Sequence, residues 1–113
     1  MDNNCVFCKI ANGYMQSHKV YEDELCLAVL DANPTSKGHT LVIPKKHIES
    51  ANEITEEDEK VIGKIFTVIK KLAKDNNLDN GYRIVNNCGE DGGQAVKHLH
   101  FHLLGGRKLK IEV

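Results

Sequence analysis

The sequence predicts a single α+β domain spanning residues 1–113, in which about five strands accompany one long helix. Three observations lead to this prediction. The chain has 113 residues, which is a usual size for one domain. One segment repeats apolar residues at helical spacing, and several β-rich runs are joined by short links, which favours an antiparallel sheet. Hydrophobic residues make up 41% and charged residues 27% of the chain, the composition of a globular domain able to bury a core without disulfides.

Three strands are predicted in the first half of the chain. His18–Asp23 and Leu25–Leu30 are separated by a tight acidic turn. Asp31–Gly38 contains Asn-Pro and Lys-Gly, both of which are typical of turns. The next run, His39–Ile43, is β-rich and is followed by Pro44, which has no N–H group to donate to a neighbouring strand.

The clearest helical pattern begins at Thr55. Thr55–Asp58 supplies a capping hydroxyl and carboxylates that stabilise the positive end of a helix. The lysines that follow lie largely outside the apolar stripe and predict a solvated face. A second, short helix is predicted near Cys8–Asn12. The apolar stripe of the long helix repeats at spacings of three and four and consists of Val61, Ile62, Ile65, Phe66, Ile69, Leu72 and Ala73.

Two further strands, Tyr82–Asn87 and His98–Leu104, are predicted on either side of a glycine-rich segment. In the last strand three histidines alternate with apolar residues, so their imidazoles are expected on one face. A single metal ion bound by all three is disfavoured, because the outer pair would lie about 13 Å apart while zinc needs each nitrogen at about 2.0–2.1 Å. The histidines are therefore expected to divide their roles.

The central histidine of the three, His100, is the candidate nucleophile. With a reference pKa of about 6.5, histidine is mostly neutral at cellular pH. A neutral imidazole can attack phosphorus when one ring nitrogen is free and an acceptor holds the proton on the other. Gly92 and Gly93 precede the strand, and glycines allow backbone N–H groups to turn toward an anion. The pattern therefore favours nucleophilic attack on a phosphate group.

Charge and cysteine usage indicate which binding partners and which cellular compartment to expect. The formal net charge is −1 and the basic residues are scattered, which argues against binding to nucleic acid or to a membrane. No apolar run approaches the roughly 18–20 residues that span a bilayer, and no secretory signal is recognisable, so a reducing cytoplasm is expected. Cys5 and Cys8 form a Cys-x-x-Cys pair, which supplies half of the ligands of a zinc site. A thioredoxin-type redox role would require a strand before this pair and a long helix after it, and neither is predicted here. Cys26 and Cys88 are predicted to be small buried side chains, and His18 to be exposed.

The stretch Gly92–Gly106 resembles the signature of the histidine triad (HIT) family, and Gly38–His47 resembles that family's first sequence block. Similarity to the Hint-like branch runs from about Cys5 to Gly106. The resemblance implies a five-stranded antiparallel sheet with one long helix and a short N-terminal helix, assembled as a homodimer. It also implies binding of purine nucleotides such as AMP or GMP, with reaction at the α-phosphate through a covalent nucleotidyl-histidine.

The resemblance further implies roles for individual residues. The catalytic set would be His39, His98, His100 and His102, with His100 as the nucleophile. The residues implied to contact nucleotide are Phe7, Ile10 and Val29 at the base, Asp31 at the ribose, Asn87, Gly93, Gln94 and Ala95 near the phosphate, and the triad members His100 and His102. Similarity to relatives that bind zinc through two cysteines and two histidines implies a structural Zn²⁺ held by Cys5, Cys8, His47 and His98.

Hydrolysis of purine nucleoside 5′-phosphoramidates, of the AMP-amine type, is the predicted activity. The alternatives are a dinucleoside polyphosphate hydrolase or nucleotidyl transferase, a non-catalytic nucleotide-binding regulatory module, and a histidine-metal oxidase. His102 separates the chain from the uridylyltransferase-like branch, where that position resembles a glutamine. Ala95 stands where Hint-like proteins often carry a hydroxyl residue, and Ala32 replaces a larger aliphatic residue, so substrate preference stays open.

Overall fold

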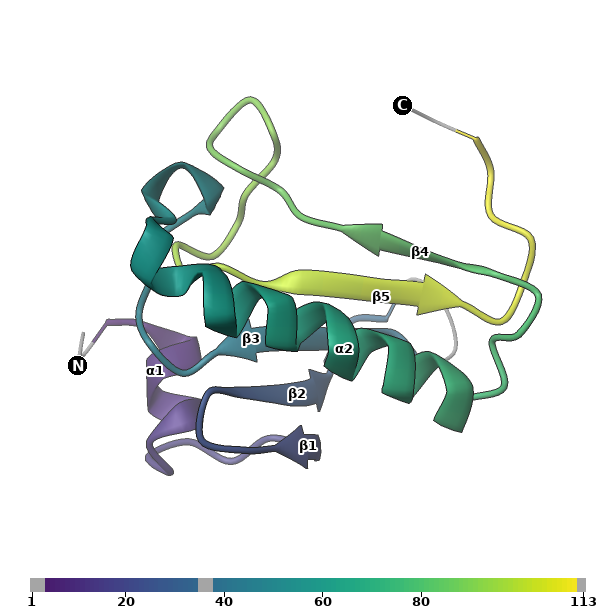
Figure 1. Ribbon diagram of the computed structural model, residues 1–113, viewed down its shortest axis with the longest axis horizontal. Helices are drawn as coiled ribbons and strands as arrows, with labels where there is room; N and C mark the ends of the chain where they lie inside the picture. The colour runs from purple at the N-terminus through teal and green to yellow at the C-terminus, as the bar shows by residue number, and fades with distance from the viewer. Residues whose placement is uncertain (1–3, 35–37, 112–113) are drawn as a thin grey trace.

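The computed structural model describes residues 4–34 and 38–111. These residues form one antiparallel sheet with a long and a short α-helix, and two short 3₁₀ turns (Figure 1). The helices are α1 (Val6–Ala11) and α2 (Glu59–Asp75), and the 3₁₀ turns are η1 (Ala51–Glu53) and η2 (Glu56–Asp58). The strands are β1 (Lys19–Glu22), β2 (Cys26–Leu30), β3 (Thr40–Pro44), β4 (Tyr82–Val85) and β5 (Phe101–Gly105). In the described part of the chain no helix is long and apolar enough to cross a membrane.

The five strands lie in the order β1-β2-β3-β5-β4, and every neighbouring pair is antiparallel. The predicted α+β fold with a five-stranded antiparallel sheet is thus confirmed. β5 lies between β3 and β4, and His102 pairs with Leu41 on one side and Val85 on the other. The last strand in the sequence therefore occupies an interior position beside β3.

The two faces of the sheet bury different sets of side chains. Because successive residues of a strand point to opposite faces, Cys26 and Ala28 of β2 pack with α2, while Leu27 and Val29 pack with α1. α2 lies along one face of the sheet (Figure 1). The face that carries α1 is only partly covered by that six-residue helix, and it also carries the polar residues described below.

The last strand is shorter than predicted. β5 begins at Phe101, so His98 and His100 precede it, and the prediction that all three imidazoles line one strand is wrong. The reason is that this backbone bonds outside the sheet: Leu99 donates its N–H to the carbonyl of Ile48 at 2.6 Å. The apolar residues between the histidines nevertheless pack together against α2 as expected, namely Leu99, Phe101 and Leu103.

Both helices begin differently from the prediction. α1 starts two residues before the predicted Cys8–Asn12, because the Cys5 sulfur accepts the Cys8 backbone N–H at 3.2 Å and caps the first turn. α2 starts after η2 rather than at Thr55. The Asp58 carboxylate accepts the Thr55 N–H at 2.9 Å and pairs with Lys46 at 2.6 Å, which holds the preceding turn in place.

Candidate functional site

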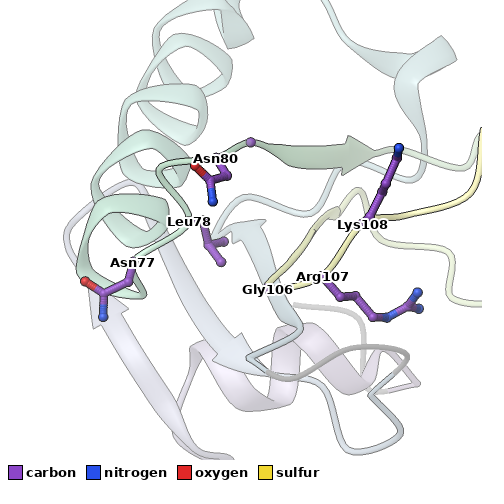
Figure 2. Close-up of a pocket in the computed structure, with 7 residues that line it drawn as sticks. Asn77, Leu78, Asn80, Gly106, Arg107 and Lys108 are labelled. Carbon is purple, nitrogen blue, oxygen red and sulfur yellow. The ribbon is translucent and has the colours of Figure 1, made fainter.

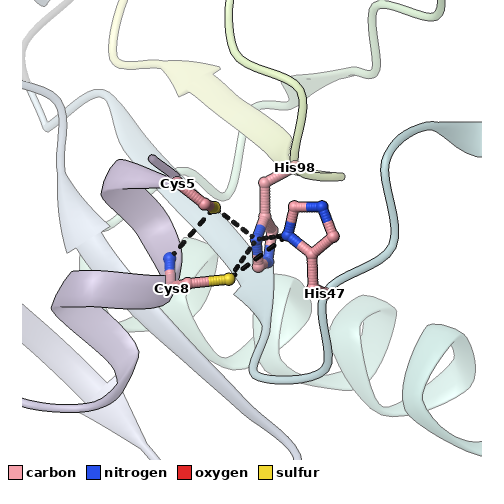
Figure 3. A group of neighbouring side chains, drawn as sticks. All are labelled: Cys5, Cys8, His47 and His98. Atoms are coloured by element: carbon pink, nitrogen blue, oxygen red, sulfur yellow. Dashed lines mark hydrogen bonds between the residues drawn. The ribbon is translucent and has the colours of Figure 1, made fainter. Parts of the chain in front are cut away.

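Four metal-binding side chains converge beneath α1 (Figure 3), and we call Cys5, Cys8, His47 and His98 the sulfur–imidazole cluster. Nδ1 of His98 lies 3.1 Å from Sγ of Cys5, 3.5 Å from Sγ of Cys8 and 3.2 Å from Nδ1 of His47. Sγ of Cys8 also lies 3.2 Å from Nδ1 of His47. Cys5 and Cys8 come from the start of α1, His47 follows β3 and His98 precedes β5.

These separations match the donor set of a tetrahedral zinc site. With Zn–S bonds of about 2.3 Å and Zn–N bonds of about 2.0–2.1 Å, tetrahedral angles give S···N separations of about 3.6 Å and N···N separations of about 3.4 Å. The four donor atoms all lie within 4.8 Å of one another, and three of the four residues are buried. Two sulfurs with two imidazole nitrogens suit Zn²⁺ better than a hard cation. The predicted ligands are therefore brought together and can hold a metal ion.

His98 is prepared for this role by its other nitrogen. Its Nε2 donates to the carbonyl of Pro44 at 2.8 Å, which leaves Nδ1 as the lone-pair donor facing the sulfurs. The side chain is fully buried. Burial lowers the pKa of His98 to about 4, and the neighbouring His47 and His100 act in the same direction against the Pro44 bond. The imidazole is thus neutral at physiological pH, as a metal ligand must be.

His100 lies between the sulfur–imidazole cluster and a second polar group. Its Nδ1 donates to the backbone carbonyl of His98 at 2.7 Å, so Nε2 carries the lone pair. The ring is 7% exposed and packs edge-on against Phe7, with ring centroids 5.1 Å apart. Asn86 donates from its side chain to the His100 carbonyl at 3.0 Å. The hydrogen bond at Nδ1 gives the tautomer that a nucleophilic imidazole requires.

We call the second group, Asp31, His39 and His102, the carboxylate–imidazole cluster. Nε2 of His39 lies 2.9 Å from Nδ1 of His102 and 3.4 Å from Oδ2 of Asp31. Burial lowers the pKa of His39, partly opposed by the charge of Asp31. Burial and the neighbouring imidazoles of His100 and His39 lower the pKa of His102. The residues follow β2, precede β3 and lie in β5 respectively, and strand parity puts all three on the face that carries α1.

The glycine-rich loop before His98 is held by its own hydrogen bonds. Gly93 has a φ of +78°, and a Cβ at Gly92 would lie 2.3 Å from the carbonyl oxygen of Cys88. The backbone N–H groups of Gly93 and Gln94 donate to the carbonyls of residues 90 and 89. The side-chain amide of Gln94 donates to the carbonyls of Glu49 and Val96 at 2.6 and 3.0 Å. In this structure each of these two N–H groups has an acceptor within the loop, and contact of Gly93 and Gln94 with phosphate stays a prediction.

The remaining residues implied to contact nucleotide fall into two groups. Phe7, Ile10 and Val29 pack together in the core between α1 and the sheet, and are 7%, 6% and 2% exposed. Asn87 donates from its side chain to the carbonyl of Gly92 at 2.8 Å, and Ala95 is exposed at the end of the same loop. The three apolar residues are thus assembled under α1, and the loop residues precede His98 in the chain.

Sequence reasoning missed three backbone carbonyls and one side chain that hold the segment around His98 and His100 in place. The carbonyls belong to Pro44, Ile48 and His98, and a carbonyl leaves no mark in a sequence pattern. The side chain is that of Asn86, next to the predicted Asn87. Of the other sequence predictions, Cys26 is buried and His18 exposed, as expected, whereas Cys88 is partly exposed because it lies in the glycine-rich loop.

A cavity of about 490 Å³ lies beyond the far end of β5 from His100 (Figure 2). Arg107 and Lys108 project from its rim in different directions (Figure 2). Its lining contains neither a carboxylate nor a histidine, in contrast to the two clusters beside His100. The lining residues are Asn77, Leu78, Asn80, Gly81, Gly106, Arg107 and Lys108.

Known proteins resemble this chain in sequence and in fold. An uncharacterized HIT-like protein of Methanocaldococcus jannaschii is 49% identical over 104 residues, covering 88% of this chain and 77% of that protein. A histidine triad protein from Clostridium difficile superposes with a TM-score of 0.95 at 48% identity, covering 100% of this chain and 99% of that one. A HIT family hydrolase from Legionella pneumophila superposes with a TM-score of 0.93 at 44% identity, covering 96% of this chain and 97% of that one. A histidine triad nucleotide-binding protein from Candida albicans superposes with a TM-score of 0.82 at 33% identity, covering 97% of this chain and 85% of that one. The HIT domain model matches residues 12–109, and this chain therefore belongs to the HIT domain family.

Proposed function

We propose that this protein hydrolyses purine nucleoside 5′-phosphoramidates through a covalent nucleotidyl intermediate on His100. The observation that carries the proposal is the 2.7 Å bond from His100 Nδ1 to the His98 carbonyl. Because that bond keeps the proton on Nδ1, the lone pair on Nε2 is available to attack phosphorus. Two related proteins support the reaction class, since one is described as a hydrolase and another as nucleotide-binding.

The proposed reaction has two steps. In the first, Nε2 of His100 forms a bond to the α-phosphorus as the bond from phosphorus to the amine breaks, and the amine leaves with a proton. In the second, water attacks the nucleotidyl-histidine, releases the nucleoside monophosphate and restores the imidazole. His39 and His102 lie 2.9 Å apart beside His100 and are the groups that would deliver and collect protons.

Substrate recognition is assigned to the carboxylate–imidazole cluster and its surroundings. Asp31, whose side chain is 19% exposed, would accept the two ribose hydroxyls. Phe7, Ile10 and Val29 would enclose the base from beneath α1. The amide of Asn87 and the exposed Ala95 would lie along the phosphate and the leaving group.

The sulfur–imidazole cluster would hold a structural Zn²⁺ that takes no part in bond making. A zinc ion there would cross-link α1 to the segments after β3 and before β5. Since His98 also supplies the carbonyl that orients His100, the ligands of this ion would fix the position of the nucleophile. Metal analysis of protein purified without chelators should give about one zinc per chain.

We also propose a homodimer, as the family resemblance implies. β1 and β4 are the two outer strands of the sheet, and outer strands carry backbone groups that can pair with a second chain. Light scattering on the purified protein should give twice the chain mass of 12.6 kDa.

The test of the proposed activity compares His100→Ala with His18→Ala, which removes an exposed imidazole outside the site. With an AMP-amine substrate, His100→Ala should lower kcat by at least about 10³-fold while AMP affinity measured by calorimetry changes by less than about threefold. His18→Ala should match the parent protein. Turnover that survives His100→Ala would overturn the proposal. A dinucleoside polyphosphate assayed beside the phosphoramidate reports which leaving group is preferred.

A further inference from the structure

The carboxylate–imidazole cluster has the composition of a metal site as well as that of a hydrogen-bonded group. One carboxylate oxygen and two imidazole nitrogens, from Asp31, His39 and His102, lie within 4.8 Å of one another. They come from three separate segments of the chain and meet on one face of the sheet. The set shares no residue with the sulfur–imidazole cluster, so an ion bound here would be additional to the structural one.

The separations agree with ligands around a single ion. Two ligands at about 2.1 Å that subtend a right angle at the ion are about 3.0 Å apart, and tetrahedral ligands are about 3.4 Å apart. His39 Nε2 lies 2.9 Å from His102 Nδ1 and 3.4 Å from Asp31 Oδ2. An ion placed about 2 Å from each atom would replace the hydrogen-bonded contacts with coordinate bonds while the backbone keeps its position.

The chemistry of the donors selects the kind of ion. Two imidazoles and one carboxylate suit borderline divalent transition metals such as Zn²⁺, Co²⁺ and Ni²⁺ better than Mg²⁺ or Ca²⁺. Three protein ligands leave coordination positions open for water, in contrast to the four ligands of the sulfur–imidazole cluster. The Asp31 side chain is 19% exposed and the His39 side chain 4% exposed, so one side of the set meets solvent. These features describe an exchangeable site.

We propose that Asp31, His39 and His102 bind one exchangeable divalent transition-metal ion, and that this ion competes with nucleotide. The ring centroids of His102 and His100 are 5.1 Å apart, so the ion would lie beside the nucleophile. Coordination would also occupy the Asp31 carboxylate. The competition rests on the proposed function, because that function assigns Asp31 to the ribose hydroxyls. The binding of the ion does not depend on it.

Titration with Ni²⁺ tests the binding. Protein already loaded with one zinc per chain should take up one further Ni²⁺, measured by calorimetry and by the visible absorption of the ion. His39→Ala should abolish this second binding event and leave the first metal in place, while His18→Ala should keep both. His102→Gln provides a second variant in case His39→Ala does not fold. A single metal per chain at saturating Ni²⁺, or a second ion that survives both variants, would overturn the inference.

Competition between Ni²⁺ and nucleotide is measured through the affinity for AMP rather than through turnover. At Ni²⁺ ten times its own dissociation constant, the apparent Kd for AMP should rise about tenfold in the parent protein and stay unchanged in His39→Ala relative to that variant without Ni²⁺. If the second ion binds but AMP affinity is unaffected, the competition is wrong. If Ni²⁺ binds and no phosphoramidate is hydrolysed in its absence, the proposed activity fails while the metal site stands.

Discussion

The two polar clusters on either side of His100 differ in closure and in chemistry. The sulfur–imidazole cluster is mostly buried, has four donors and sits beneath α1, and its histidine His98 uses both ring nitrogens internally. The carboxylate–imidazole cluster has three donors, is partly exposed and includes the charge of Asp31. The first arrangement can fix structure, and the second can exchange protons, ligands or ions with solvent.

The comparison explains why three histidines at alternate positions act differently. His98 and His102 belong to separate clusters, and His100 between them is oriented by a backbone carbonyl rather than by either cluster's side chains. Phe7 makes edge-on ring contacts with both His98 and His100, at centroid distances of 5.8 and 5.1 Å. Disturbing the first cluster should therefore cost both stability and rate, whereas disturbing the second should cost rate alone.

The largest effect is expected from breaking the sulfur–imidazole cluster. Cys8→Ser removes a sulfur ligand and should lower the unfolding free energy by at least about 3 kcal/mol, or roughly 10 °C in Tm, because a structural zinc site contributes folding energy directly. Calorimetric melting checks this, and kcat should fall as well. Cys88→Ser, at a partly exposed cysteine outside the cluster, is the matched control. Equal Tm values for the two variants would refute a structural metal site.

The next effect is expected from the carboxylate–imidazole cluster. His102→Ala removes the partner of His39 and should lower kcat/KM by about a hundredfold, the usual contribution of a positioned acid–base group. Its Tm should stay within about 3 °C of the parent, since less than 1 kcal/mol is expected to be lost at this partly exposed position. A loss of Tm as large as that of Cys8→Ser would erase the distinction between the clusters.

A smaller effect is expected from the loop that leads into the histidines. A Cβ at Gly92 would lie 2.3 Å from the backbone oxygen of Cys88, so Gly92→Ala must shift the loop. We expect kcat/KM to fall about tenfold and the unfolding free energy to fall by about 1–3 kcal/mol, because the atoms that the Cβ meets belong to the backbone. Gly63→Ala is the control, since Gly63 lies in α2 with open space around it, and alanine there should stabilise the helix by about 0.5–1 kcal/mol. Unchanged kinetics in Gly92→Ala would show that the loop does not position substrate.

The smallest effect is expected in the β1–β2 turn, which contains no residue of either cluster. Burial opposes ionisation of Asp23, but hydrogen bonds from Tyr21, Cys26 and Leu25 outweigh it and lower the pKa to about 2. Because the folded pKa lies below the unfolded value of about 3.9, this stabilisation is complete above pH 4 and is lost as the pH falls toward 2.

Asp23→Asn should therefore lower the unfolding free energy at pH 7 by about 1 kcal/mol, once screening by solvent is allowed for. The difference from the parent protein should shrink below pH 4, and kcat/KM should not change at any pH at which both are folded. Urea titrations at pH 7 and pH 2.5 measure this. If the two proteins differ in unfolding free energy by the same amount at both pH values, the stabilisation does not come from the charge of Asp23.

Much of the fold could be predicted from the sequence, because periodicity reports which face of each element is buried. The buried stripe of α2 follows from apolar residues spaced three to four apart, and the strands follow from apolar residues at alternate positions. Phe66 is the exception within the stripe, since it is 45% exposed at the edge of the helix contact. The boundaries at His98 and Thr55 were misjudged because long-range partners, Ile48 and Lys46, decide them.

The candidate site was less accessible to sequence reasoning. Strand spacing predicted that the three histidines do not share one ion, and the structure places His98 and His102 in different clusters, although His98 and His100 lie outside the strand on which that spacing was based. The meeting of Asp31 with His39 and His102 depends on the order of strands in the sheet, which periodicity does not report. The donors that the glycine-rich loop offers depend on its internal hydrogen bonds, which already use the N–H groups of Gly93 and Gln94.

The central claim is that His100 forms a bond to phosphorus while its neighbours do not. Mass spectrometry of protein quenched with acid-free denaturant during turnover of an AMP-amine tests it most directly. Peptide mapping should find one AMP moiety attached to the imidazole of His100, and none on His98 or His102. An adduct on either neighbour, or full turnover without any trapped adduct under conditions that preserve phosphohistidine, would contradict the claim.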